Sequence, residues 1–148
     1  MHTKYYNWVV VVFPVADLLN DTKITLWIQT QLNNVKSKYL DGINIDVEQP
    51  INQGSPLING LTKFTKRVVD SFHLSIPGSQ VTFDVAWSAK NAKGKGVDGR
   101  NYDYKSLGEI CDFLFIMAYD EQSQIFDEDC LARPNSGNNK QKIKTRKK

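Results

Sequence analysis

Residues 41–48 read DGINIDVE, and polar and apolar side chains alternate strictly along them. Successive side chains of an extended chain point to opposite faces, so Asn44, Asp46 and Glu48 would share one face and the three aliphatic side chains the other. Same-face neighbours lie about 6–7 Å apart along a strand, near enough for one carboxylate to influence the ionisation of the next. The pattern predicts a β-strand with an acidic face. The alternative without function is a solvent-facing amphipathic edge strand.

Four strands are predicted along the chain, at residues 8–13, 41–48, 81–87 and 113–119. Helical spacing of apolar residues predicts one helix capped by Asp21 or Thr22 and a second helix over residues 57–72. A short helical turn is expected at residues 106–111. The first and last strands are almost wholly apolar, and we expect both to be buried. Strands that alternate with helices over short connections favour a parallel sheet, so the predicted fold class is α/β.

Acidic or aromatic side chains stand at or near the carboxyl ends of three successive strands: Asp46 and Glu48, Asp84 and Trp87, and Tyr119 and Asp120. In a (β/α)8 barrel the carboxyl ends of the strands form the edge at which active sites are built. Four strands within about 120 residues would make half of such a barrel. We therefore predict a partial (β/α)8 TIM barrel of about four parallel strands with intervening helices.

The chain has 148 residues, of which 41% are hydrophobic, as in a globular protein. We expect a partial barrel domain over residues 1–130 and a disordered basic tail over residues 131–148, since six Lys and Arg side chains fall within the last nine residues. No basic stripe precedes the tail, so no nucleic-acid partner is expected. The apolar run at residues 8–13 is far shorter than the roughly 20 residues of a membrane span. We expect no membrane contact, no signal peptide and a monomer.

Cys111 and Cys130 have no spacing that is typical of zinc ligands, so neither a metal nor a cofactor is expected, and their disulfide state stays open. A calcium-binding loop is disfavoured, because apolar residues alternate through residues 41–48 where oxygen ligands would be needed. A Ser-His-Asp hydrolase is also disfavoured, since His2 and His73 have no nucleophile motif near them.

Two segments resemble the signatures of one enzyme family. Leu40–Glu48 is similar to the Asp-Gly motif with alternating acids that marks the family 18 glycoside hydrolases, the chitinase-like (β/α)8 barrels. Met117–Asp120 is similar to the Met-x-Tyr-Asp segment that the family places on its sixth strand. Over roughly residues 27–130 the likeness is to the chitobiase group, which would make the four strands the third to sixth of the barrel. Nothing resembles the first two or last two strands, so we expect a partial chain.

The resemblance implies that Glu48 is the general acid that protonates the glycosidic oxygen and later the base that activates water. Family 18 departs from the scheme of two catalytic carboxylates, because the acetamido oxygen of the substrate attacks the anomeric carbon and forms an oxazolinium intermediate. Asp46 would accept the acetamido N–H and stabilise the positive charge, and Tyr119 would donate its hydroxyl to the acetamido group. The implied catalytic residues are thus Glu48, Asp46 and Tyr119.

The residues implied to bind substrate are Asn44, Asp120, Met117 and Trp87. Asn44 stands where most chitinases have Asp, and it would supply a hydrogen bond in place of a shared proton. Asp120 would bind a sugar hydroxyl or hold the tyrosine. Trp87 would offer a stacking surface for a sugar ring, although a core tryptophan is the alternative.

By this resemblance the protein is a chitobiase-like glycosidase located in lysosomes. It would hydrolyse β-1,4 N-acetylglucosamine linkages in the chitobiose core of asparagine-linked glycans and in chitin oligosaccharides, so N-acetylglucosamine oligosaccharides are the expected partners. The alternative is a catalytically inactive truncated isoform or a chitinase-like sugar-binding protein. Sugar-binding proteins of this kind typically lack the acid, whereas Glu48 is present.

Overall fold

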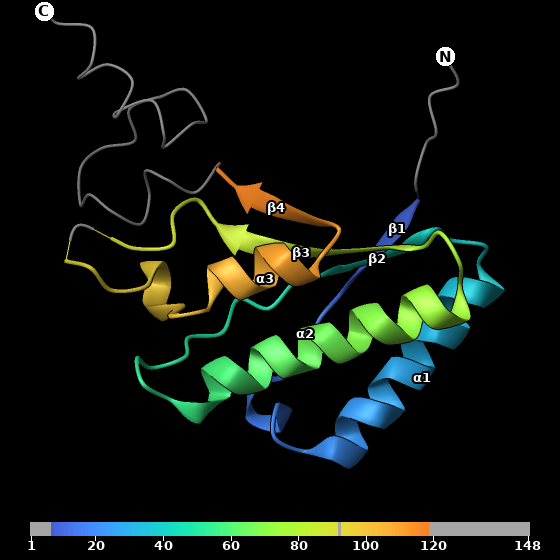
Figure 1. Ribbon diagram of the computed structural model, residues 1–148, viewed down its shortest axis with the longest axis horizontal. Helices are drawn as coiled ribbons and strands as arrows, with labels where there is room; N and C mark the ends of the chain where they lie inside the picture. Colours follow the sequence, from blue (N-terminus) through green and yellow to red (C-terminus); the bar gives the residue numbers. More distant parts are fainter. Residues whose placement is uncertain (1–6, 92, 119–148) are drawn as a thin grey trace, which may run out of the picture.

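The computed structural model describes residues 7–91 and 93–118. Four strands alternate with helices along the chain (Figure 1): β1 (Trp8–Val11), β2 (Gly42–Ile45), β3 (Gln80–Ala86) and β4 (Phe113–Met117). All neighbouring pairs are parallel, and the strand order is β1-β2-β3-β4. The predicted α/β class, with about four parallel strands and intervening helices, is confirmed.

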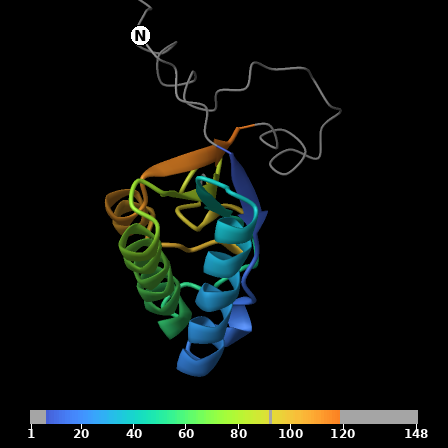
Figure 2. The same ribbon diagram turned by 90° about the vertical axis from the view of Figure 1, so that its right-hand side faces the viewer.

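Three α-helices follow the first three strands: α1 (Asp21–Ser37), α2 (Pro56–Ser75) and α3 (Tyr104–Ile110). Two short 3-10 helices, η1 (Val15–Asp17) and η2 (Val97–Gly99), precede α1 and α3. The α-helices lie on the same side of the strands (Figure 2), as in one sector of a (β/α) barrel. No helix within the described residues is long and apolar enough to cross a membrane.

The two long helices begin where capping side chains satisfy free backbone N–H groups. The side chain of Asn20 accepts a hydrogen bond from the Lys23 N–H at 3.0 Å, so Asn20 is the cap of α1, and the prediction of Asp21 or Thr22 is wrong by one or two positions. Asp21 instead occupies the first turn, where a carboxylate interacts favourably with the helix dipole. Ser55 caps α2 in the same way and is followed by proline at the first helical position.

An aromatic cluster joins the start of the sheet to both long helices. The ring of Phe64, on α2, is fully buried and stacks on Phe13 with centroids 4.4 Å apart. Trp27, on α1, meets Phe13 edge-on and donates its indole N–H to the Val12 carbonyl at 3.0 Å. These contacts fix α1 and α2 against the segment that follows β1.

The two faces of the sheet differ in burial. On the helix side Ile43 and Ile45 are completely buried, whereas on the opposite side Val10 is 60% and Phe113 58% exposed. The expectation that the first and last strands are buried is therefore wrong for most of their described residues. Helices leave one face of the sheet uncovered, and in the edge strand β4 Ile116, which pairs with Val85, is also 53% exposed. Strand β4 ends at Met117, so the last two residues of the predicted strand fall partly outside the described part. Residues 1–6, the tail from 131 and Cys130 also lie outside it.

Candidate active site

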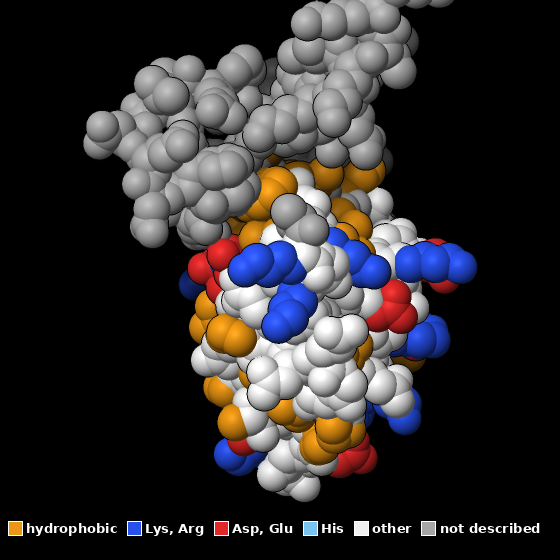
Figure 3. Space-filling model, turned by 90° about the vertical axis from the view of Figure 1, so that its left-hand side faces the viewer, with side chains coloured by type: hydrophobic (Ala, Val, Ile, Leu, Met, Phe, Trp, Pro, Cys, Tyr) orange, Lys and Arg blue, Asp and Glu red, His pale blue; other side chains and the backbone are white. Residues whose placement is uncertain are grey.

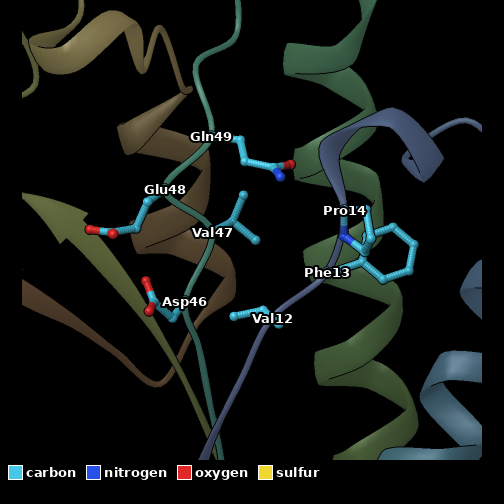
Figure 4. Close-up of a pocket in the computed structure, with 7 residues that line it drawn as sticks. All are labelled: Val12, Phe13, Pro14, Asp46, Val47, Glu48 and Gln49. Atoms are coloured by element: carbon cyan, nitrogen blue, oxygen red, sulfur yellow. The ribbon is translucent and has the colours of Figure 1, made fainter.

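Two carboxylates project together from the segment that leaves β2. Figure 4 shows Asp46 and Glu48 on one side of this segment, and Val47 and Gln49 on the other. The Asp46 N–H donates to the Val11 carbonyl at 2.8 Å, so pairing with β1 continues past the end of the strand. Val47 is 2% exposed, whereas the Glu48 side chain is 48% exposed. The alternation predicted from the sequence thus places one accessible and one half-buried acid side by side.

The turn before α1 contacts the other side of this segment, the side on which Val47 and Gln49 lie. The Gln49 side chain accepts a hydrogen bond from the Val15 N–H at 2.7 Å. Together with Val12, Phe13 and Pro14, the segment lines a pocket of about 240 Å³ (Figure 4). The backbone that carries Asp46 and Glu48 is therefore fixed from the β1 side.

A buried polar network lies next to the two acids, on the open face of the sheet. It begins at Asn44, two residues before Asp46. The register pairs Asn44 with Thr82, and the Thr82 hydroxyl donates to the Asn44 side-chain oxygen at 2.6 Å. The Asn44 amide donates in turn to Asp84 Oδ2 at 2.7 Å. All three side chains are at least nine-tenths buried. The chain thus places a third carboxylate, Asp84, next to the predicted site.

Asp46 and Asp84 are held in surroundings that oppose their ionisation. Burial raises the pKa of Asp84, the hydrogen bond from Asn44 lowers it, and the charges of Asp46 and Glu48 raise it further. Burial also raises the pKa of Asp46, as does the charge of Glu48, whereas Arg100 lowers it. One oxygen of Asp46 and one of Asp84 are buried without a hydrogen-bond partner among the described residues. Both oxygens remain available as acceptors.

A buried arginine contacts the exposed acid. Arg100 comes from the connection between β3 and α3, and its Nη2 lies 3.1 Å from Glu48 Oε1 and 3.7 Å from Asp98 Oδ2. The Arg100 side chain is 7% exposed. The carboxyl group of Glu48 is thus in contact with a guanidinium from a distant part of the chain.

The backbone on either side of Glu48 is bound by the same connection. The Tyr102 hydroxyl donates to the Gln49 carbonyl at 2.6 Å and lies 3.1 Å from the Val47 carbonyl. Farther along, the Ile51 N–H donates to the Gly99 carbonyl at 3.0 Å. Burial raises the pKa of the Tyr102 phenol, so this hydroxyl keeps its proton and remains a donor.

A groove of about 620 Å³ runs over the open face of the sheet. Its floor is polar and includes Asn44, Asp46 and Asp84, while aromatic side chains such as Trp8 and Phe113 form its walls. Figure 3 looks onto the side toward which the arrows of β3 and β4 point in Figure 1, and there Lys and Arg side chains lie beside a few Asp and Glu side chains on an otherwise uncharged surface. These residues lie on the face of the sheet opposite the helices, which in a complete (β/α)8 barrel is packed by side chains of the other strands.

The remaining predicted site residues are placed less centrally. Met117 is 5% exposed at the end of β4, paired with Ala86. Trp87 directly follows β3 and is half-buried, with its indole N–H buried and without a hydrogen-bond partner among the described residues. Tyr119 and Asp120 lie outside the described residues. The structure thus brings Asn44, Asp46 and Glu48 together and leaves the other four assignments as predictions.

Sequence reasoning placed Asp84 near the carboxyl ends of the strands but gave it no role, and it missed Arg100. The signal for Asp84 is an acid in an otherwise apolar strand, two residues from Thr82 and on the same face. Arg100 carries none, because a single arginine in a Gly- and Lys-rich loop is ordinary surface composition.

Metal and thiol chemistry find little support in the described residues. They contain no group of three or more His, Cys, Asp or Glu side chains that could hold a metal ion. The Cys111 thiol is buried, and burial together with the charge of Asp112 raises its pKa to about 12. A thiol with so high a pKa is a poor nucleophile or ligand at neutral pH.

Comparison with known proteins agrees with this geometry. The model of glycosyl hydrolases family 18 matches residues 15–144. Di-N-acetylchitobiase from Homo sapiens is 49% identical over 122 residues, which cover 82% of this chain and 30% of that protein. The relative from Rattus norvegicus is 45% identical over the same length and is covered to 32%. The chain therefore spans about a third of the length of the curated relatives it matches.

Solved structures show the same fold. The spore cortex-lytic enzyme SleL from Bacillus megaterium superposes with a TM-score of 0.63 at 16% identity, covering 76% of this chain and 27% of that one. A chitinase double mutant from Cycas revoluta, in complex with (GlcNAc)4, superposes with a TM-score of 0.60 at 14% identity, covering 75% and 36%. With a family model that matches most of its length and a relative at 49% identity, the chain belongs to the family 18 glycosyl hydrolases.

Proposed function

We propose that the protein hydrolyses β-1,4 N-acetylglucosamine linkages in chitobiose-type oligosaccharides. The observation that carries the proposal is the placement of Asp46 and Glu48 on one side of the segment that leaves β2, at the carboxyl edge of the sheet. The identity with di-N-acetylchitobiases supports this substrate class, because the matched part includes both acids.

In the proposed reaction Glu48 donates a proton to the glycosidic oxygen while the acetamido oxygen of the substrate attacks the anomeric carbon. The glycosidic bond breaks, the leaving sugar takes the proton, and a cyclic oxazolinium remains. Glu48 then removes a proton from water, whose oxygen attacks the anomeric carbon and reopens the ring with retained configuration. The half-exposed Glu48 side chain is accessible for both proton transfers.

Asp46 is proposed to orient and stabilise the acetamido group. One of its oxygens is buried without a hydrogen-bond partner among the described residues, so an incoming N–H donor would satisfy it. An ionised Asp46 would also favour the positive charge of the oxazolinium. Asn44 would hold the floor of the site through its hydrogen bonds to Thr82 and Asp84.

Four further assignments belong to the same proposal. Tyr119 would donate its hydroxyl to the acetamido group, and Asp120 would bind a sugar hydroxyl or hold that tyrosine. Trp87 and Met117 would line the substrate site near the ends of β3 and β4, where these strands place them. A sugar-binding protein without turnover is the less favoured function, because the acid Glu48 is present.

The decisive experiment measures release of a fluorogenic aglycone from a chitobioside. Glu48→Gln keeps the shape of the side chain and removes its proton transfer, so we expect turnover to fall by about 10²–10⁴-fold. Glu109→Gln, an exposed glutamate on α3, is the matched control and should leave turnover unchanged. Undiminished turnover in Glu48→Gln would refute the assignment. A GlcNAc-thiazoline, which mimics the cyclic intermediate, should inhibit the wild type, and lack of inhibition would count against substrate assistance.

A lysosomal location and a monomeric state complete the proposal. The location derives from the likeness to di-N-acetylchitobiases, the monomer is the state expected of the folded chain, and each has a direct test. A fluorescent fusion should coincide with a lysosomal marker, and sedimentation should give the mass of one chain. A cytosolic distribution, or a mass that rises with concentration, would overturn the respective part.

A further inference from the structure

We propose that Arg100 is a positioning residue for Glu48: its guanidinium fixes Oε1, which leaves Oε2 to exchange the proton with the substrate. The inference rests on the proposed function and deepens it, because it assigns a role to a residue outside the acidic motif. The contact that carries it is the 3.1 Å separation between Arg100 Nη2 and Glu48 Oε1.

The burial of Arg100 is costly and so needs a compensating contact. Its side chain is 7% exposed, and its Nε and Nη1 are buried without a hydrogen-bond partner among the described residues. Burial of a guanidinium with unsatisfied donors is unfavourable unless a nearby negative charge offsets it. Glu48 and Asp98 supply that charge. The arginine is thus held in place at the acid rather than extended into solvent, where arginine is usually found.

The path of the chain around Arg100 allows little freedom. A Cβ atom at Gly96 would lie 2.4 Å from the Arg100 carbonyl oxygen, closer than any side chain could tolerate. Gly99 has a φ of +73° and a Cβ there would meet Pro50, which follows Glu48 by two residues. The two glycines therefore let the loop approach the segment that carries the acid.

The connection between β3 and α3 contacts both the backbone next to Glu48 and the Glu48 side chain. The Tyr102 hydroxyl bonds the Gln49 carbonyl at 2.6 Å, directly after Glu48, while Arg100 contacts the carboxylate. Backbone and carboxylate are thereby oriented by residues two positions apart. A proton donor must meet the glycosidic oxygen within hydrogen-bonding distance, so loss of this orientation would slow catalysis more than it weakens binding.

The charge of Arg100 also affects the pKa of the second acid, Asp46. Arg100 lowers the pKa of Asp46, against the effect of burial and of Glu48. Removal of the cation therefore raises the pKa of Asp46, so that a higher pH is needed to ionise it. If Asp46 acts as a carboxylate, the acidic limb of the pH–rate profile moves to higher pH. A residue that only supports the fold would not shift this limb.

The test compares Arg100→Met and Arg100→Lys in the full chain, with a chitobioside as substrate. We expect kcat to fall by about 10–100-fold in Arg100→Met with KM within about twofold, and the acidic limb to move to higher pH. Arg100→Lys keeps the charge and should lose less. Arg67→Met is the matched control, since Arg67 is a half-buried arginine whose ion pair with Asp21 links α1 to α2 and does not involve Glu48.

Two further outcomes decide the proposal. Addition of millimolar guanidinium to Arg100→Ala should restore part of kcat, because the small cation can occupy the buried site. If Arg100→Met does not fold, Arg100→Gln decides instead, and a wild-type kcat in that neutral variant overturns the role of Arg100. Wild-type kcat in all Arg100 variants, with Glu48→Gln inactive, refutes only this inference, whereas turnover in Glu48→Gln refutes the proposed function itself.

Discussion

The side-chain amide of Asn44 donates to Asp84 Oδ2 at 2.7 Å, joining β2 to β3 beneath the two acids of the candidate active site. Asn44 is 9% and Asp84 7% exposed, so the bond lies in surroundings of low polarity. A neutral donor at position 44 satisfies the buried carboxylate without adding a second charge. The amide of Asn44 is thus paired with an acid on the neighbouring strand.

Asn44→Asp is expected to destabilise the fold in a pH-dependent manner. It would place two carboxylates within hydrogen-bonding distance, and they can remain there only by sharing a proton. Thermal unfolding should show a loss of about 1–3 kcal/mol at pH 7 that becomes smaller toward pH 4. Addition of Asp84→Asn should restore stability, because the donor and acceptor are merely exchanged. Equal losses in the single and double variants would contradict the direct contact.

Asp84 is also expected to shape the pH dependence of wild-type stability. Burial raises the pKa of Asp84 above its ordinary value of 3.8, so the folded state holds this proton more tightly than the unfolded chain. Its contribution to stability is therefore fully present below pH 3.8 and declines as the pH rises through the folded pKa. Asp84→Asn should flatten this decline. Asp70→Asn, an exposed acid on α2, is the control and should leave the slope unchanged.

The regular part of the fold follows from local sequence patterns. The alternation in residues 41–48 predicts the orientation of Asp46 and Glu48, because opposite faces of an extended chain are fixed by its geometry. The helix over residues 57–72 is predicted well for a similar reason, since its apolar residues recur with the period of one buried stripe. Local periodicity thus determines which side chains share a face.

Such local patterns do not predict which distant segments of the chain will contact each other. An apolar strand such as residues 113–117 does not reveal which of its faces a helix will cover, and its Phe113 proves 58% exposed. The approach of Arg100 to Glu48 depends on the course of a loop that has no periodicity. The cap of α1 was misplaced because Asn20 and Asp21 are both good capping residues, and only the backbone decides which side chain reaches the free N–H.

Asn20→Ala should therefore weaken α1 by about 1 kcal/mol, because it leaves the Lys23 N–H without its side-chain acceptor. Denaturant unfolding measures this loss. Asn20→Asp keeps an acceptor oxygen at the same place and should be close to the wild type. Both substitutions should be compared in protein without glycans, since Asn20 begins an Asn-Asp-Thr glycosylation sequence. An equal loss in Asn20→Asp and Asn20→Ala would argue against the cap.

Gly42, the second residue of the acidic motif, is expected to tolerate no side chain. A Cβ atom there would lie 1.8 Å from the Gln80 carbonyl oxygen, so the approach of β2 to β3 requires glycine at this position. Gly42→Ala would force the two strands apart at their first pair, and with them the register that joins Asn44 to Thr82. We expect a loss of at least about 3 kcal/mol, which is comparable with severe overpacking of a core.

Gly108→Ala is the matched control for this substitution. Its Cβ would meet only the Leu114 side chain, at an ordinary distance of 3.4 Å, and alanine is a better helix former than glycine within α3. This variant should be unchanged or more stable by up to about 1 kcal/mol. Circular dichroism during thermal unfolding distinguishes the two outcomes. A Gly42→Ala protein that unfolds at the wild-type temperature would show that β2 and β3 are not packed as closely as described, and the arrangement of the acids above them would then need another explanation.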